Sequence, residues 1–232
     1  MKEDMKDFLL EINVEELPSG YVRPALAQLK EAFIEKLRAE RIEHGDVRVV
    51  GTAAALLCYV KDMQLKQEGL SQEIIGPPKR IALDENNNLT PQGIGFAKNQ
   101  GVGIKDLKIK QMPKGEYVFI VKKINSKPAK EVLRGLLPEI IKSIGFPKTM
   151  KWDDSGMRFA RPIESVLALL DKENIKIRLG NIPSRAIKGL SAEAYLKRLQ
   201  KSCVMDQDKR KLEIEKMIKL AQKKLGMDEI VD

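Results

Sequence analysis

The run Phe8-Leu-Leu-Glu-Ile-Asn-Val14 joins consecutive apolar residues to a short alternating pattern, which predicts a β-strand. Pro18 and Gly20 interrupt this pattern. An amphipathic helix is predicted next, with Pro24 in its first turn and Gly45 at its end. Its apolar residues recur at spacings of three, four and four: Leu26, Leu29, Phe33 and Leu37. A strand followed directly by a helix indicates a fold that mixes both kinds of element.

Further strands and helices are predicted along the rest of the chain. Apolar stretches predict strands at 47–50, 56–60 and 174–179, and a hairpin from 107–112 and 117–124. The fold class that follows is α+β, with a mixed sheet forming the body.

Helices are predicted where a capping residue precedes an apolar helical pattern. Three lie in the body, from Thr90-Pro91 to Gly101, from Ser126 to Gly145, and from Arg161-Pro162 through Leu170. Two more, at 191–200 and 206–225, form a C-terminal helical segment. This segment is expected to be a helical pair or a bridge to a following part.

The composition is typical of a globular protein and excludes several other classes. The chain has 232 residues, of which 43% are hydrophobic and 32% charged, so it can bury a core of its own. No apolar run approaches the roughly 18 residues that a membrane span needs, and the charged N-terminus is not a signal peptide. Cys58 and Cys203 lie far apart and lack the paired spacing of metal ligands. They indicate a reducing compartment and no metal knuckle. The lone His44 argues against histidine-based triads and metal sites.

The net charge of +9 is concentrated in one part of the chain. Residues 101–151, called the basic segment below, hold twelve basic and four acidic residues, and the rest of the chain is almost neutral. Such an excess is typical of a surface that binds a phosphate backbone. A solvated lysine-rich surface, as in heat-stable proteins, explains the charge equally well.

Several patterns that suggest catalysis or metal binding are incomplete. The run from Gly93 to Lys98 starts like a dinucleotide-binding loop but has lysine in place of the third glycine. Glu15-Glu16 is better explained as a turn device than as an acid–base pair, and Asp153-Asp154 as a solvated turn than as a cation site. Trp152 lies among basic residues, where it could stack on a base or act as a buried anchor.

Two stretches in the second half of the chain have a specific pattern, Phe146-Pro-Lys-Thr-Met-Lys-Trp152 and Arg158-Phe-Ala-Arg-Pro-Ile163. They are similar to Phe-Pro-Lys-Ser-Met-Arg-Trp and Arg-Phe-Val-Arg-Pro-Ile, two signatures of the bacterial glycyl-tRNA synthetase β subunit family. Further matches follow the order of the family along the chain: Leu9 to Pro18, Gly76-Pro-Pro78, Gly95 to Gly101, and Lys114-Gly-Glu-Tyr117.

The resemblance implies that the chain corresponds to the N-terminal part of such a subunit. Residues 1–190 would form a body similar to the B3/B4 module of the phenylalanyl-tRNA synthetase β subunit. Residues 191–232 would lead towards the HD-like and anticodon-binding domains of the family, for which this chain has no room.

The resemblance also implies a function. The family's enzyme is an α2β2 heterotetramer of the cytoplasm that joins glycine to tRNA-Gly at the expense of ATP. Activation with ATP and magnesium resides in the α subunit, so this part would need no cofactor, hold no catalytic residue or metal, and serve tRNA binding and subunit assembly. Two alternatives are a docking module for the α subunit without tRNA affinity, and an editing hydrolase.

The residues expected to contact tRNA are basic residues in or beside the basic segment, together with the tryptophan. They are Lys122, Lys123, Lys148, Lys151, Trp152, Arg158 and Arg161. The cations would pair with phosphates and Trp152 could stack on a base, although Arg161-Pro162 could equally just open a helix.

The chain departs from the family pattern in two places. After Thr52 the family has Pro-Arg-Arg, whereas this chain has Ala53-Ala54-Ala55. After Gly189 the family continues with His-Arg-Phe and a strand, whereas this chain enters a helix directly, so residues 189–191 mark a shortened stretch. A contact that the arginines make in the family would be missing here.

Overall fold

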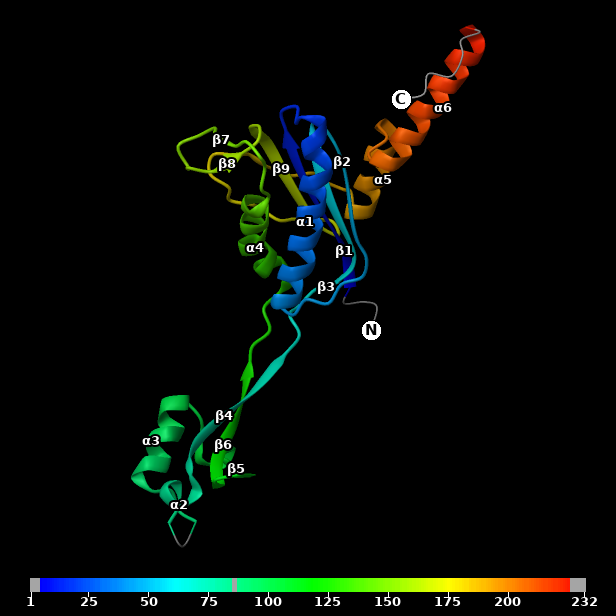
Figure 1. The fold of residues 1–232 in the computed structure, drawn as a ribbon. Helices are drawn as coiled ribbons and strands as arrows, with labels where there is room; N and C mark the ends of the chain where they lie inside the picture. The colour runs from blue at the N-terminus through cyan, green and yellow to red at the C-terminus, as the bar shows by residue number, and fades with distance from the viewer. Residues whose placement is uncertain (1–4, 85–86, 226–232) are drawn as a thin grey trace. The chain divides into compact units, whose positions relative to one another are not determined.

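The computed structural model describes residues 5–84 and 87–225 (Figure 1). In it the chain divides into two compact units. Unit 1 comprises Met1–Gln67 and Lys127–Asp232, and unit 2 comprises Glu68–Ser126. The architecture is α+β with mostly antiparallel sheets and a C-terminal helical segment, which confirms the predicted fold class.

The sheet of unit 1 is built around β1 (Met5–Val14). Its strand order is β10-β9-β1-β3-β2, with neighbours antiparallel. Residue bounds are β2 Val47–Thr52, β3 Ala55–Gln64, β9 Ile163–Leu170 and β10 Glu173–Asn174. The short β11 (Ser184–Arg185) pairs in parallel with β9. The strands expected at 8–14, 47–50 and 56–60 are therefore confirmed.

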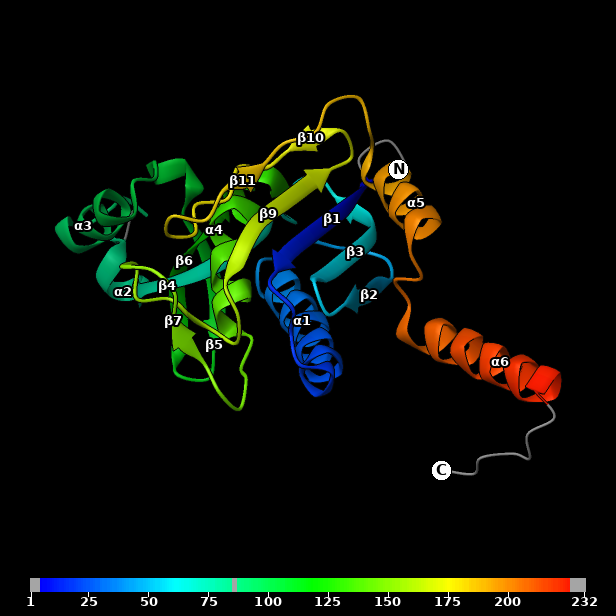
Figure 2. The same cartoon turned by 90° about the horizontal axis from the view of Figure 1, so that it is seen from above.

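Helices pack on both faces of this sheet (Figure 2). Phe8, Leu10 and Ile12 of β1 join the larger core cluster, together with α1 (Ser19–Ala39) and α4 (Ala129–Ser143). Leu9 points to the other face and joins a smaller cluster with α5 (Ala192–Ser202). Side chains alternate between faces along a strand, so β1 needs apolar residues in both registers, which explains its unbroken apolar run.

The helix predicted from Arg161-Pro162 through Leu170 is wrong, because this part of the chain forms the strand β9, which begins at Ile163. Residues 166–170 of β9 are all buried, because β9 lies beside β1 with a core cluster on each face. A continuous apolar run is equally typical of a strand covered on both faces and of a buried helix. The residues that flank this run did not distinguish the two. The strand expected at 174–179 shrinks to β10, with irregular backbone after Asn174.

Two helix boundaries also differ from expectation. Helix α1 begins at Ser19, which places Pro24 inside it, and ends at Ala39 well before Gly45. Helix α4 begins at Ala129 after Pro128, so Ser126 is not its cap. Pro128 precedes the first helical residue, where its fixed φ suits the entry into the helix and no side chain caps the N-terminus.

Unit 2 contains a smaller sheet, in the order β4-β6-β5. The strands are β4 Leu70–Pro78, β5 Lys108–Met112 and β6 Gly115–Ile124, and β5 and β6 form the predicted hairpin. The helices are α2 Lys79–Ala82 and α3 Pro91–Gln100, with a 3-10 turn η1 at Ile104–Asp106. Thr90 caps α3 by accepting a hydrogen bond from Gly93 N, and Gly101 ends it at φ 67°, both as predicted.

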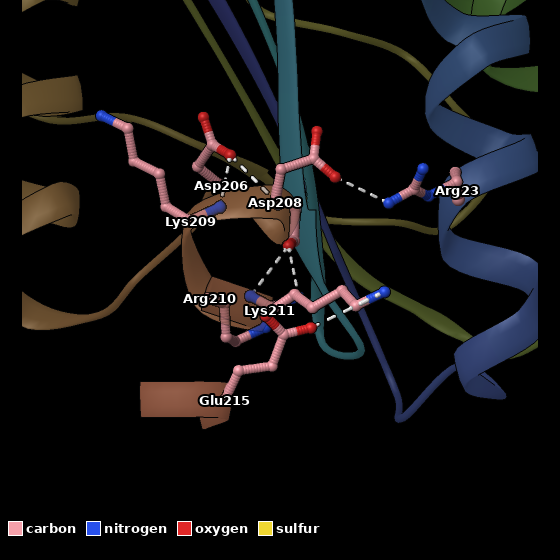
Figure 3. A network of polar contacts seen from close by, with 8 residues as sticks. Arg23, Asp206, Asp208, Lys209, Arg210, Lys211 and Glu215 are labelled. Carbon is pink, nitrogen blue, oxygen red and sulfur yellow. Dashed lines mark hydrogen bonds and ion pairs between the residues drawn. The ribbon is translucent and has the colours of Figure 1, made fainter. Parts of the chain in front are cut away.

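The C-terminal helices agree with the predicted pair. Ser191 Oγ caps α5 by accepting from Ala194 N at 3.2 Å. Helix α6 (Gln207–Leu225) buries none of its side chains and is attached at its first turn (Figure 3). There Asp208 pairs with Arg23 of α1 at 2.8 Å, as Figure 3 shows. Arg210 donates to the carbonyl oxygens of Gly51 and Val204. No helix among the described residues is long and apolar enough to cross a membrane.

Asp206 fixes the start of α6. Its Oδ1 accepts from the backbone N–H groups of Asp208 and Lys209, each at 3.2 Å, and its Oδ2 pairs with Arg48 at 3.2 Å. We expect Asp206→Ala to lower the free energy of unfolding by about 1 kcal/mol, the usual cost of losing an N-cap, and to reduce the helical signal. Circular dichroism during urea denaturation measures both. Asp208→Ala, which removes an exposed ion pair, is the control and should cost less.

The contribution of Asp206 should also depend on pH. Hydrogen bonding from Lys209 N, and pairing with Arg48, lower the pKa of this carboxyl below its ordinary value of 3.8. The stabilisation is therefore complete above that ordinary value and is lost as pH falls through the lower pKa of the folded state. If the wild type and Asp206→Ala differ equally at pH 7 and below pH 3, the assigned role is wrong.

Candidate nucleic-acid interface

The segment after α4 is anchored on the N-terminal half of α1. Gly145 N donates to Gln28 Oε1 at 2.8 Å, and Gln28 Nε2 donates back to the Gly145 carbonyl at 3.0 Å. The ring of Phe146 lies between Tyr21, at 5.9 Å between centroids, and Phe159, at 4.7 Å and edge-on. These aromatic contacts hold the start of the family-like motif at 146–152 against unit 1.

A short hairpin follows, made of β7 (Met150–Lys151) and β8 (Arg158–Phe159). Lys151 lies opposite Arg158, which brings two of the predicted cations together. Trp152 Nε1 donates to the Phe159 carbonyl at 3.0 Å, while 37% of the residue remains exposed. The indole N–H of Trp152 is thus anchored while the residue stays partly exposed, and stacking on a base remains a prediction.

The other predicted residues on this hairpin differ in how they are held. Arg158 Nε donates to Thr149 Oγ1 and its Nη2 to the Thr149 carbonyl, both at 3.1 Å, so this guanidinium braces the hairpin. Lys148 and Lys151 are exposed. Among the described residues, no carboxylate lies within 4.0 Å of Lys148, Lys151 or Arg161. These three positive charges are therefore available to an anionic ligand.

Arg161 lies beside the loop that follows β1. It shares a cavity of about 500 Å³ with Glu15, Glu16 and Ser19, and Glu15 N donates to the Pro162 carbonyl at 3.0 Å. Residues 161–162 therefore do not begin a helix. They lie just before β9 and are hydrogen-bonded to the loop that follows β1. The carboxylates of Glu15 and Glu16 were expected only as turn devices, and their proximity to Arg161 was not predicted, because it depends on the pairing of β1 with β9.

The turn that carries the three alanines is part of the same region. Val14 N donates to the Ala54 carbonyl at 3.0 Å and Leu17 N to the Ala53 carbonyl at 2.8 Å. Backbone hydrogen bonds thus connect the turn between β2 and β3, the loop after β1 and the start of β9. Three motifs that lie far apart in sequence meet at one end of the sheet, called the motif end below.

The remaining predicted residues belong to unit 2. Lys122 and Lys123 lie on β6, opposite Gln72 and Ser71 of β4, and the side chain of Lys123 falls outside the described part. The structure therefore groups Lys148, Lys151, Trp152, Arg158 and Arg161 in unit 1, apart from these two lysines. Met150, which was not predicted as a site residue, is 57% exposed and lies two residues before Trp152 in the sequence.

The carboxylates near the hairpin form a turn. Asp153 Oδ1 accepts hydrogen bonds from Ser155 N, at 3.0 Å, and from Ser155 Oγ, and its Oδ2 accepts from Asn181 N. The Ser155 hydroxyl is the main cause that lowers the pKa of Asp153. In the described ranges 5–84 and 87–225, no group of three His, Cys, Asp or Glu side chains could hold a metal ion. The solvated turn expected for Asp153-Asp154 fits this arrangement better than a cation site does.

Comparison with known proteins identifies similar chains. Residues 8–232 match the family described as "Glycyl-tRNA synthetase beta subunit". A glycine–tRNA ligase beta subunit of Clostridioides difficile is 40% identical over 226 residues, covering 91% of this chain and 33% of its own. Those of Desulforamulus reducens and Bacillus subtilis are 38% and 37% identical, each covering 77% of this chain and 26% of its own. The chain spans about a quarter to a third of the length of these curated relatives.

The packing of Phe146 leads to a test of how the interface is supported. Phe146→Ala removes a half-buried ring between Tyr21 and Phe159, and we expect a loss of about 2 kcal/mol in unfolding free energy, below the cost for a fully buried phenylalanine. Urea denaturation measures it. Lys148→Ala, an exposed change two residues away, should stay within about 0.5 kcal/mol. Equal effects of the two variants would contradict the proposed anchoring.

Proposed function

This chain belongs to the glycyl-tRNA synthetase beta subunit family, and from that membership we propose that it contributes tRNA binding to a glycine–tRNA ligase. The assembled enzyme would join glycine to tRNA-Gly with ATP. Glycine activation, with ATP and magnesium, is assigned in this proposal to the α subunit. Residues 1–190 would act as a B3/B4-like body, and 191–232 would lead to the later domains.

The observation that carries the proposal is the chemistry of the β7–β8 hairpin. Lys148 and Lys151 offer unpaired cations next to Trp152 in the sequence, Trp152 is 37% exposed, and Arg161 adds a third unpaired cation just after the hairpin. Lysine and arginine pair with phosphate oxygens regardless of sequence, and an exposed aromatic ring stacks on an unpaired base. This combination suits the backbone of an RNA with an accessible unpaired nucleotide.

Titration of tRNA-Gly at increasing salt tests the role of the hairpin. The double variant Lys148→Ala with Lys151→Ala should weaken tRNA binding. It should also reduce the magnitude of the slope of log affinity against log salt concentration by roughly one to two, since two phosphate contacts are removed. Lys172→Ala with Lys176→Ala, a matched pair of exposed lysines elsewhere in unit 1, should change neither quantity. Identical slopes for both double variants would refute the proposal.

The alanine turn gives a gain-of-function test. Ala54 is exposed at the motif end that also holds Arg161, and the family pattern has arginine at this position. We expect Ala54→Arg to raise tRNA affinity several-fold at low salt, with a steeper salt dependence, because it adds one phosphate contact. Ala54→Gln is the neutral control of similar length. If arginine gives no gain over glutamine, position 54 does not face the RNA.

A protein-docking role remains the second candidate, and one observation favours it. Met150 and Trp152 are 57% and 37% exposed, and apolar surface of this kind is enriched at protein interfaces. In this candidate the basic hairpin docks on an acidic face of the α subunit and has no tRNA affinity. Pull-down of the α subunit and of tRNA-Gly, each separately, distinguishes the two. Retention of α alone favours docking, whereas retention of tRNA supports the main proposal.

A further inference from the structure

The sheet of unit 2 is covered by helices on one face. Val118 and Ile120 of β6 are buried on that face, where the backbone of Gly76 lies so close to the Phe96 ring of α3 that a Cβ would approach it within 2.7 Å. The alternate residues point to the opposite face, called the open face below. By strand register it carries Glu73 and Ile75 of β4, Tyr117, Phe119 and Val121 of β6, and Lys108 and Lys110 of β5.

The open face exposes apolar side chains. Ile75 is 50% exposed and Val121 is 39% exposed, although both lie within strands. Tyr117, Phe119 and Val121 follow one another at every second residue of the central strand and therefore lie on the same side, and Phe119 pairs directly with Ile75. Both aromatic residues are half-buried. A pair of aromatic rings on the central strand of an antiparallel sheet is an arrangement on which unstacked nucleobases can lie.

Positive charge borders these rings. Lys108 lies opposite Phe119, and Lys110 lies opposite Tyr117. The Nζ of Lys110 is 5.7 Å from the centroid of the Phe119 ring, a cation–π distance. The same Nζ pairs with Glu73 Oε2 at 2.5 Å. Because Glu73 is on β4 and Lys110 on β5, this ion pair spans the central strand beside Phe119.

We propose that the open face of unit 2 binds single-stranded RNA, with bases stacked on Phe119 and Tyr117 and phosphates paired with Lys108 and Lys110. In the free protein the Glu73 carboxylate holds Lys110 in the place of a phosphate. Both partners of this pair are about half exposed, at 49% and 47% of their side chains, so exchanging one anion for another costs little. The inference rests on the proposed function only in the choice of RNA as ligand.

RNA suits this face better than a protein segment does because of its chemistry. The lysines lie beside the aromatic rings, so one ligand must offer both flat π surfaces and closely spaced anions. Unpaired nucleotides carry these two features together, and base stacking on aromatic side chains tolerates many sequences. Duplex RNA keeps its bases stacked internally and cannot use the rings. Selectivity for single strands over duplex is therefore the distinguishing property of the site.

Fluorescence anisotropy with the full chain tests the inference, using a labelled single-stranded pyrimidine octamer and a duplex of equal length. The wild type should prefer the single strand. Phe119→Leu, which keeps apolar volume but removes the stacking surface, should weaken its binding by about tenfold. Glu73→Gln should tighten it several-fold, because Lys110 is released and a repelling charge is lost. Glu116→Gln, which breaks the exposed Lys79–Glu116 pair on the other face, should change affinity less than twofold.

Other outcomes would overturn the inference. Absence of octamer binding at low salt would reject RNA as the ligand and leave the face to a protein partner. Equal effects of Glu73→Gln and Glu116→Gln would show that only overall charge matters. If Lys148→Ala with Lys151→Ala abolished octamer binding while Phe119→Leu left it unchanged, binding would belong to the hairpin of unit 1. The proposed function would then stand while this inference fails.

Discussion

The fold of unit 1 depends on burying β1 on both faces. Its backbone is paired with β3 on one side and β9 on the other, so its polar main-chain groups are satisfied inside the core. Among the residues that the structure describes, Glu11 is the only buried charged side chain, and it must be paired there. Its Oε2 accepts from Tyr195 Oη of α5 at 2.9 Å and pairs with Arg185 of β11 at 3.2 Å. One buried carboxylate thus couples the central strand to α5, which covers its second face, and to β11, which pairs with β9 in the same sheet.

The same constraint explains how the motif end is held together. β1 ends at Val14, where the neighbouring antiparallel strands β3 and β9 begin. The N–H groups of the following loop therefore need hydrogen-bond acceptors outside the strand ladder. These acceptors are the carbonyls of Ala53, Ala54 and Pro162. Residues that recognise a ligand are commonly found on such loops, held by a rigid scaffold. The hairpin with Trp152 is braced differently, through Phe146 and Arg158, so side-chain packing supports it more than the sheet does.

Local signals in the sequence predicted local structure well. The strand at 8–14, the hairpin of β5 and β6, helix α3 between Thr90 and Gly101, and the two C-terminal helices are confirmed, because alternation and capping act over a few residues. The prediction failed at 161–170, where burial on both faces erased the alternation that marks a strand. The division at Gln67 and Ser126, and the approach of Glu15 and Glu16 to Arg161, arise from long-range pairing, which no local pattern encodes.

The charged residues of the chain are distributed and paired differently in the folded structure than their order in the sequence indicates. The basic segment, continuous in sequence, is divided between the units, with six basic and two acidic residues in each part. Lys110 and Lys130 pair with Glu73 and Glu173, carboxylates that lie outside the segment. Part of the sequence-level excess is therefore neutralised by residues that sequence counting assigns elsewhere. An anionic ligand binds where cations are unpaired beside an aromatic ring or can exchange their partner. The positions of these cations therefore matter more for binding than the net charge of +9.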